Sequence, residues 1–571
     1  MPFAAFEHES WLAFFKALRG SFKIPSTEAI GCDLMRSEYA LTMNDVLLAL
    51  AKNTRICFTL DGATNVQGKQ IINMMACRPQ PFFLKHFTIE LRRESAANLL
   101  EKFLNCKLRL LGSIRKPAPG FVLTTDEEDV KNPMNDTDVE VEREEGRPCK
   151  TNEHFINPPM FCFCSDSPSV MVKLRKDCLN TKEFVFAYGC APHAIHNLCM
   201  DLIKNFPGVK IVLKQIIYTG TVFFAAQRVR KVKAACATLP GEILNADLDI
   251  DISDDLKMLL TDPAYWRGVA AMDSLFKTIS CCLTYLEGDE ATFSAVYACF
   301  FAIKYHIKTL DLSVMEALHL NDDDICEMIR LIHHRFSTIY SEAHALVFCT
   351  DPLFTSMHRL MGFRFDEKFL HLGKGSINQQ SKTAIALISM GNEILRRSML
   401  SEFAVLVTRQ QDTEDDFSDT SIKPSVLWTV CDESSYGSLS GPLSALHQNP
   451  TGASGGERNH KATRRVHTKN RARMGHSKIE SGTAILFNSG QLVRRLTPTR
   501  NTKFCTWLQQ LGADDEGLPV EEEALDEEED AAADALIEEF DHVHISDGLE
   551  GVMGNELFDE EVMDEGSIFY N

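Results

Sequence analysis

Two aspartates, Asp61 and Asp166, have the residue type and the local setting of metal ligands. Each follows a run of β-branched and aromatic residues and precedes a turn, so each is expected where a central strand leaves a sheet. In a mixed α/β fold, that edge is where ligand sites are usually built. Carboxylates on neighbouring strands suit divalent cations, and a third would complete the pair of metal ions that promotes phosphoryl transfer. The alternative interpretation is that both are turn-forming residues that cap strands or helices.

Cys190 and His193 form a second candidate group. Their Cys-x-x-His spacing is that of a zinc-ligand pair, but no second Cys/His pair at suitable spacing accompanies it. Zinc is therefore not expected. An interior cysteine beside a hydrogen-bonded histidine explains the pair more simply.

The charge of the chain is unevenly distributed. The formal net charge is −21, yet residues 504–571 hold 23 Asp and Glu with no Lys or Arg, whereas residues 458–503 hold 12 Lys and Arg against Glu480 alone. This asymmetry predicts a polyanionic partner. The candidate phosphate-contacting residues are Arg464, Arg465, Lys469, Arg471 and Arg473. The same residues could equally form a solvated helix face or bind the acidic tail, and an autoinhibitory tail is one hypothesis.

Hydrophobic periodicity predicts the elements that position these residues. Strands are expected at 55–61, 71–77, 82–91, 160–165 and 184–188, with helices at 95–103 and 190–206 and through most of 207–400. The predicted fold is an α/β core, a mixed sheet flanked by helices, interrupted by a large all-helical insertion. The expected divisions are a helical N-terminal segment (1–50), the first part of the core (51–206) with an acidic insert (124–157), the helical insertion (207–424), a C-terminal part of the core (425–511) and a mostly disordered acidic tail (512–571).

Composition excludes several classes of protein. At 571 residues the chain is too long for one core, and its 44% hydrophobic and 24% charged residues are an ordinary globular mixture. It has no apolar run near the ~20 residues of a membrane helix, and its N-terminus lacks the features of a signal peptide. The 18 cysteines do not form a disulfide-scaffold pattern. We therefore expect an intracellular protein with reduced thiols and no membrane partner.

Five blocks of sequence, in order over roughly residues 10–500, resemble the motifs of hAT-superfamily transposases. The segment that begins at Asp61-Gly-Ala-Thr-Asn65 and continues to Ile-Ile-Asn73 resembles the family's DGWTN…IIN signature, and Phe83-Leu-Lys85 resembles the FLKS that follows. Ser165-Asp166-Ser167 looks like the TDNAS motif of the second aspartate. The residues from Cys190 to Asp201 are similar to CAAHxLNLxxxD. Glu457-Arg458-Asn459, with the basic run from His467 to Arg473, resembles the C-terminal dimerisation region of the family.

This resemblance implies a ribonuclease-H-like core with a helical insertion between the second aspartate and the glutamate. Asp61, Asp166 and Glu457 would then be the catalytic and metal-binding carboxylates, supported by Cys190, His193 and Arg458. The implied reaction is Mg²⁺- or Mn²⁺-dependent hydrolysis of a phosphodiester in DNA, followed by strand transfer by the exposed 3′-hydroxyl.

The resemblance also implies a nuclear protein that binds DNA and forms a homodimer or a higher homo-oligomer. The candidate anchors of a dimer interface are Leu427, Trp428, Leu439, Leu443, Leu446, Ile485, Leu486 and Phe487.

Several departures from the family pattern put catalysis in doubt. Residues 1–60 contain only Cys32 and Cys57, so the family's N-terminal BED zinc finger cannot be built there, and either the gene is truncated or DNA targeting lies elsewhere. The family's threonine-arginine-tryptophan motif, expected near 235–265, is missing, and an acidic insert precedes the second aspartate. Glu457 follows two helix-breaking glycines, and His460 stands where relatives keep an aromatic residue. The competing hypothesis is therefore a domesticated or degenerate DNA- or protein-binding dimer without catalysis.

Overall fold

By its contacts the chain divides into two units, Met1–Gln509 and Gln510–Asn571, and every residue described below belongs to the first. The computed structural model describes residues 13–14, 16–17, 25–51, 55–77, 80–89, 95–113, 160–181, 184–218, 254–288, 291–354, 372, 375–409, 421–431, 436–468, 471, 473–494 and 498–499. The expectations for the acidic insert, the acidic tail and Lys469 lie outside these residues, as do residues 235–253 of the region in which the missing motif was expected.

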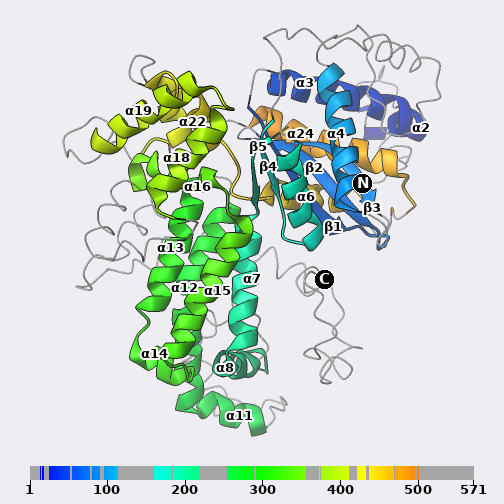
Figure 1. Ribbon diagram of the computed structural model, residues 1–571. Helices are drawn as coiled ribbons and strands as arrows, with labels where there is room; N and C mark the ends of the chain where they lie inside the picture. The colour runs from blue at the N-terminus through cyan, green and yellow to red at the C-terminus, as the bar shows by residue number, and fades with distance from the viewer. Residues whose placement is uncertain are drawn as a thin grey trace. The chain divides into compact units, whose positions relative to one another are not determined.

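A five-stranded mixed sheet forms the α/β part of the described chain (Figure 1). Its strands are β1 (Cys57–Thr64), β2 (Gln70–Cys77), β3 (Pro81–Ile89), β4 (Met160–Ser165) and β5 (Phe184–Gly189), in the spatial order β3-β2-β1-β4-β5. β1, β2 and β3 pair antiparallel, whereas β4 pairs parallel with both β1 and β5. The predicted mixed sheet flanked by helices is confirmed.

The turn between β1 and β2 is built by Asn65. Its side-chain Oδ1 accepts hydrogen bonds from the backbone amides of Gln67 and Lys69, each at 2.9 Å, as is typical of an Asx turn. Gly68 has φ +74°, a conformation that favours glycine. These local contacts close the hairpin and place Asp61 opposite Asn73 in the β1–β2 ladder.

Helices cover both faces of the sheet. On one face, Phe103 of α4 (Ala96–Ser113) packs edge-on against Phe58 of β1 and Phe163 of β4, and α4 contacts α6 (Ser169–Asn180). Because side chains alternate along a strand, Asp61, an odd number of residues from Phe58, points to the other face. There lie α23 (Ser454–Val466), which contacts β1, β2 and β3, and α24 (His476–Val493), which contacts β3 and α3 (Met35–Ala51). The short α2 (Thr27–Ala29) and η2 (Ile30–Leu34) precede α3.

The described part of residues 191–447 is helical, as predicted for most of it (Figure 1). Its helices are α7 (Ala191–Asn205), α8 (Pro207–Tyr218), α11 (Asp254–Thr261), α12 (Pro263–Glu287), α13 (Ala295–Lys308), α14 (Leu312–Ala317), α15 (Asp322–Ile339), α16 (Glu342–Cys349), α18 (Ile377–Ile388), α19 (Glu393–Arg409), α20 (Pro424–Val430) and α22 (Ser440–His447). Tyr297 and Phe300 of α13 pack against Phe336 of α15, with ring centroids 5.2 and 5.1 Å apart. Arg335 of α15 joins this block to α7 through both carboxylate oxygens of Asp201, at 2.6 and 2.7 Å.

Among the described residues, α12 is the one helix long and apolar enough to cross a membrane by length and composition. This is weak evidence for a span, because core helices share both properties. Its most apolar window is 56% buried inside the protein, and α12 packs against α7, α8 and α13. It therefore behaves as a core helix here.

Most of the residues predicted to anchor a dimer are buried within this one chain. Trp428 donates its indole N–H to the backbone oxygen of Thr350 at 2.9 Å, and Leu439, Leu443 and Leu446 lie in the core. Phe487 is also buried, Leu427 and Ile485 are half-buried, and Leu486 is exposed. Their apolar pattern reflects packing inside the subunit, so it carries no argument for a dimer interface.

His344, at the start of α16, makes the stability of the fold sensitive to acid. The side chain is 0% exposed, its Nδ1 accepts the backbone N–H of Ser341 at 3.1 Å, and burial lowers its pKa from 6.5 to about 4. Between pH 6.5 and 4 the unfolded chain binds a proton that the native chain excludes. The free energy of unfolding should therefore fall by roughly 3 kcal/mol on acidification from this group.

Equilibrium unfolding at several pH values measures this effect. His344→Gln should lack that part of the loss between pH 6.5 and 4, whereas His334→Gln, at an exposed position on α15, should lose stability like the parent. Identical acid profiles for His344→Gln and the parent would contradict the expectation.

Candidate functional site

Asp61 and Asp166 lie side by side where the pairing of two parallel strands ends. The expectation that the strand of Asp61 leaves the sheet there was wrong, because pairing with β2 continues β1 to Thr64. The β1–β4 ladder ends at the pair Leu60 and Ser165, and each aspartate is the next residue along its chain. Asp61 is 2% exposed and Asp166 8%. Burial, followed by the negative charge of Asp61, raises the pKa of Asp166 from 3.8 to about 7. The structure thus brings together the two aspartates predicted from strand boundaries.

Asp166 has an oxygen that no described group satisfies. Its Oδ1 is buried and has no hydrogen-bond partner among the described residues. A buried, unpaired carboxylate oxygen is energetically costly, and a neighbouring like charge increases the cost. Both penalties would be relieved by a cation between the two carboxylates.

Arg175 of α6 holds the backbone around Asp166 in place. Its guanidinium donates to the backbone oxygens of Asp166 and Ser165, at 2.6 and 3.0 Å, and to the backbone oxygen of Thr338 at 2.9 Å. The arginine is itself buried. Sequence analysis did not single it out, since a lone arginine on a helix is usually a surface residue.

Two glycines let the first turn of α23, which carries Glu457, approach Asp61 closely. α23 begins at Ser454 and includes Gly455 and Gly456 in its first turn. A Cβ on Gly455 would lie 2.7 Å from Cβ of Pro81, and a Cβ on Gly456 would overlap Cβ of Asp61 and lie 2.8 Å from its Oδ2. The expectation that these glycines break the helix was wrong. They permit the helix to approach β1 and β3 at a distance that no larger residue allows.

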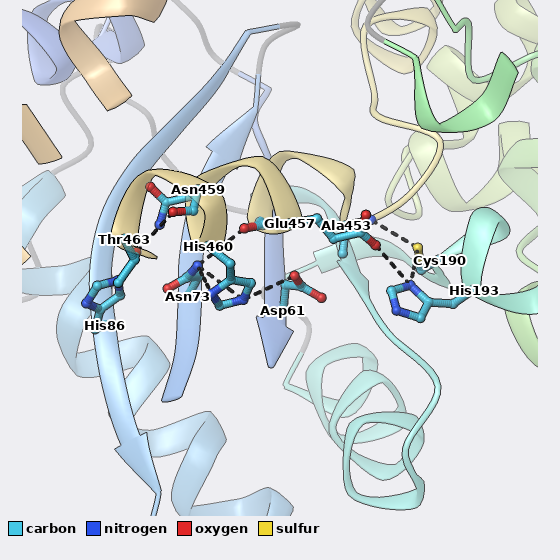
Figure 2. Close-up of polar contacts among 11 residues, drawn as sticks. Asp61, Asn73, His86, Cys190, His193, Ala453, Glu457, Asn459, His460 and Thr463 are labelled. Carbon is cyan, nitrogen blue, oxygen red and sulfur yellow. Dashed lines mark hydrogen bonds and ion pairs between the residues drawn. The ribbon is translucent and has the colours of Figure 1, made fainter. Parts of the chain in front are cut away.

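A histidine–cysteine pair contacts Glu457 from α7 (Figure 2). His193 Nδ1 lies 3.7 Å from Glu457 Oε1 and 3.0 Å from Cys190 Sγ, and the sulfur also accepts the backbone N–H of Ala453 at 3.2 Å. Burial alone would lower the pKa of His193, but Cys190, Asp61 and Glu457 outweigh it and raise that pKa well above 6.5. Burial, together with Asp61, raises the pKa of Glu457 against the opposing charge of His193. The pair therefore ties the start of α7 to the start of α23.

His460 lies between Asp61 and Asn73 (Figure 2). Asn73 Nδ2 donates to His460 Nδ1 at 2.9 Å, which places the proton of a neutral ring on Nε2, 3.3 Å from Asp61 Oδ2. Sequence analysis noted His460 as a departure from a family pattern and gave it no role. Asn73 could have been identified as a site residue from the sequence, because the predicted hairpin places it opposite Asp61.

A fourth carboxylate, Glu287, approaches from the end of α12. Its residue is partly open to solvent, yet burial of the carboxyl, followed by the charge of Glu457, raises its pKa to about 7. Arg458, predicted to support the site, donates from Nη1 to the backbone oxygen of Glu287 at 3.3 Å. No local pattern in the sequence connects residue 287 to residue 457.

The predicted DNA-binding residues lie along and beyond α23. Arg464, Arg465 and Arg473 are exposed, whereas Arg471 is half-buried and donates to the backbone oxygen of Val466 at 3.3 Å. None of the hydrogen bonds or ion pairs described above joins these arginines to the three carboxylates.

The donor set fits a divalent cation at Asp61 and Asp166. In the described part of the chain, no three His, Cys, Asp or Glu side chains are grouped closely enough to form a metal-binding cluster. The pair of buried carboxylates and the unpartnered Oδ1 of Asp166 nevertheless have the hard oxygen atoms that Mg²⁺ and Mn²⁺ prefer. Glu457, as positioned here, contacts His193.

Comparison with known proteins yields no relative. No family model matches the chain, and no curated protein matches it. The functional argument therefore depends on the site.

Proposed function

We propose that this chain is a transposase-derived protein of hAT type, with a ribonuclease-H-like core that binds DNA and hydrolyses a phosphodiester bond with a divalent metal. The observation that carries the proposal is the adjacent, buried pair Asp61 and Asp166, one carboxylate oxygen of which has no partner among the described residues. The strand order β3-β2-β1-β4-β5, antiparallel in its first three strands and parallel afterwards, supports the ribonuclease-H-like assignment.

In this proposal Asp61, Asp166 and Glu457 hold Mg²⁺ or Mn²⁺. The bound metal supplies positive charge that stabilises the attacking and leaving oxygens of the phosphodiester, and strand transfer by a freed 3′-hydroxyl would use the same chemistry. His460 orients Asp61 through its Nε2, and Arg175 fixes the backbone that carries Asp166. His193 holds the carboxylate of Glu457, which would complete the ligand set if it turned toward the aspartates.

The proposal includes DNA as the partner, a homodimer as the assembly and the nucleus as the location. The exposed Arg464, Arg465 and Arg473 support DNA binding, since positive charge on an exposed surface attracts the phosphate backbone. Dimerisation and nuclear location rest on the sequence resemblance.

A second candidate function is DNA binding without cleavage. The contact of His460 with Asp61 favours it, because the histidine occupies an oxygen of a carboxylate that is already almost fully buried. The family that the chain resembles keeps an aromatic residue at this position, which could not make this contact.

A cleavage assay on the full chain distinguishes the two candidates. End-labelled duplex DNA should be nicked with Mg²⁺ or Mn²⁺ but not with EDTA, and Asp61→Asn should remove the activity. The control Glu327→Gln, at an exposed carboxylate that pairs with its helix neighbour Arg330, should leave cleavage unchanged. Binding without nicking by the parent chain would establish the second candidate, and neither binding nor nicking would reject both.

A further inference from the structure

A shallow pocket lies beside the carboxylate site, between the β1–β2 turn and α23. Asn65 and Val66 line it from the turn, and His460, Arg464 and His467 line it from α23 and the residue after its end. His460 is also the residue that contacts Asp61. The pocket is therefore one side chain away from the candidate catalytic carboxylates.

His467 is a polar side chain without a described partner in this pocket. Its residue is 1% exposed, and both ring nitrogens are buried with no hydrogen bond to any described residue. Its backbone N–H donates to the backbone oxygen of Thr463 at 2.7 Å, so only the side chain lacks a described partner. A buried imidazole has at least one N–H to donate, and leaving it unpaired is costly.

The pocket has the charge and donor composition of an anion site. Arg464 contributes a positive charge, and the buried ring of His467 has an N–H that no described residue accepts, whereas both ring nitrogens of His460 are engaged by Asn73 and Asp61. The Oδ1 of Asn65 is used by the turn, which leaves its Nδ2 as a further donor. Among the described residues that line the pocket there is no carboxylate.

The pocket is large enough only for a small chemical group. Its cavity volume is about 20 Å³, room for about one water-sized group, and it is open on one side. A nucleobase does not fit. An oxygen of a tetrahedral anion can enter while the remainder of the anion stays at the mouth, where Arg464 is exposed.

We propose that this pocket binds one phosphate group of a nucleic-acid strand, with Arg464 at its mouth and the imidazole of His467 at its base. The inference rests on the proposed function, because DNA binding by this chain is what would bring a nucleic-acid strand to the pocket. The phosphate held here lies next to the one at the carboxylates, with His460 between them. Binding at this point would set the register of the strand relative to Asp61.

The test measures DNA binding by the full chain in EDTA, so that cleavage plays no part. Fluorescence anisotropy with a labelled duplex gives the dissociation constant at several salt concentrations. Arg464→Gln should weaken binding about fivefold at low salt and reduce the slope of log affinity against log salt by about 0.7–0.9, the contribution of one phosphate contact. Arg397→Gln removes the same charge from an exposed position on α19, which does not line the pocket, and should change affinity less than twofold. Equal effects of the two substitutions would overturn the proposal.

His467→Leu separates a binding role from a structural one. Leucine has a similar volume and no polar atoms, so the substitution should weaken DNA binding about fivefold while raising the melting temperature by a few degrees, since it removes unpaired buried nitrogens. A lower melting temperature with unchanged affinity would show that the ring is structural, against the proposal.

Inorganic phosphate distinguishes a free anion from a strand. If phosphate raises the melting temperature of the parent, but Arg464→Gln and His467→Leu leave DNA affinity unchanged, the pocket serves the free anion and the nucleic-acid assignment is wrong. If the parent binds no DNA, the proposed function fails separately. In that case, the pocket is still an anion site if phosphate raises the melting temperature of the parent more than that of Arg464→Gln. If phosphate raises both equally or neither, the pocket is not an anion site.

Discussion

Asp166→Asn is expected to reduce metal-dependent DNA cleavage at least about 100-fold while making the metal-free protein more stable. The loss follows because substitutions in groups that merely support a metal ligand already cost about 10–100-fold in affinity or activity, and Asp166 is a proposed ligand itself. The gain in stability follows from the contacts of Asp166. It is buried beside Asp61, and one of its oxygens has no partner among the described residues.

The size of the stability effect follows from the charge that is removed. A pKa raised from 3.8 to about 7 corresponds to roughly 4 kcal/mol of unfavourable interaction for the ionised form. The amide of asparagine keeps part of the burial penalty, so a net gain on the order of 2 kcal/mol is expected at pH 8. Chemical denaturation in EDTA measures it, and added Mg²⁺ should stabilise the parent more than the variant.

Asp201→Asn is the matched control for Asp166→Asn. Asp201 accepts both hydrogen bonds of a bidentate contact from Arg335, so its neutralisation should lower stability by about 1–3 kcal/mol. Cleavage should change far less than in Asp166→Asn. The assignment of Asp166 fails if Asp166→Asn cleaves DNA normally, or if it is destabilised as Asp201→Asn is.

Gly456→Ala is expected to disrupt the site through a single methyl group. The added carbon would overlap Cβ of Asp61, and that strand lies in the centre of the sheet. The start of α23 must therefore move, at an overpacking cost of about 1–3 kcal/mol. Glu457 moves with the helix, and a displacement near 1 Å costs about 100-fold in rate.

Gly490→Ala tests whether this result comes from contact rather than from helix propensity. Gly490 lies inside α24, where an added Cβ meets no atom within 4 Å. Alanine is the better helix former by about 1 kcal/mol, so Gly490→Ala should raise stability and leave cleavage unchanged. Thermal denaturation and the cleavage assay on both variants provide the comparison. The proposed close approach of α23 to β1 would be refuted by a Gly456→Ala protein as stable and as active as the parent.

The sheet could be predicted from the sequence because strand signals are local. Runs of β-branched and aromatic residues that end in turn residues place β1, β2, β3, β4 and β5 within a few residues of their observed bounds. The same boundaries singled out Asp61 and Asp166, although β1 continues past Asp61 to Thr64. Whether these two strands are neighbours is a long-range property, which the β1–β4 ladder resolves.

Two predictions show where local patterns stop being informative. Gly455 and Gly456 read as helix breakers, because propensity scales describe an isolated helix and omit the approach of another chain segment. The apolar residues of the C-terminal region, such as Trp428 and Leu443, were predicted to anchor a second subunit. Periodicity indicates that a face is buried but not against which surface, and here most of them pack inside the same chain.

The sequence by itself determined the elements, the uneven charge and two of the carboxylates at the centre of the site, because each is encoded by residues a few positions apart. Only the tertiary structure decided which distant groups meet there. His460 on Asp61 and Glu287 near Glu457 have no signature in spacing, since each contact joins segments far apart in the chain. Arg175 follows Asp166 by only nine residues, but it meets that backbone because α6 packs against β4. Packing of helices against the sheet creates those contacts, and a single methyl group on Gly456 would be enough to disturb them.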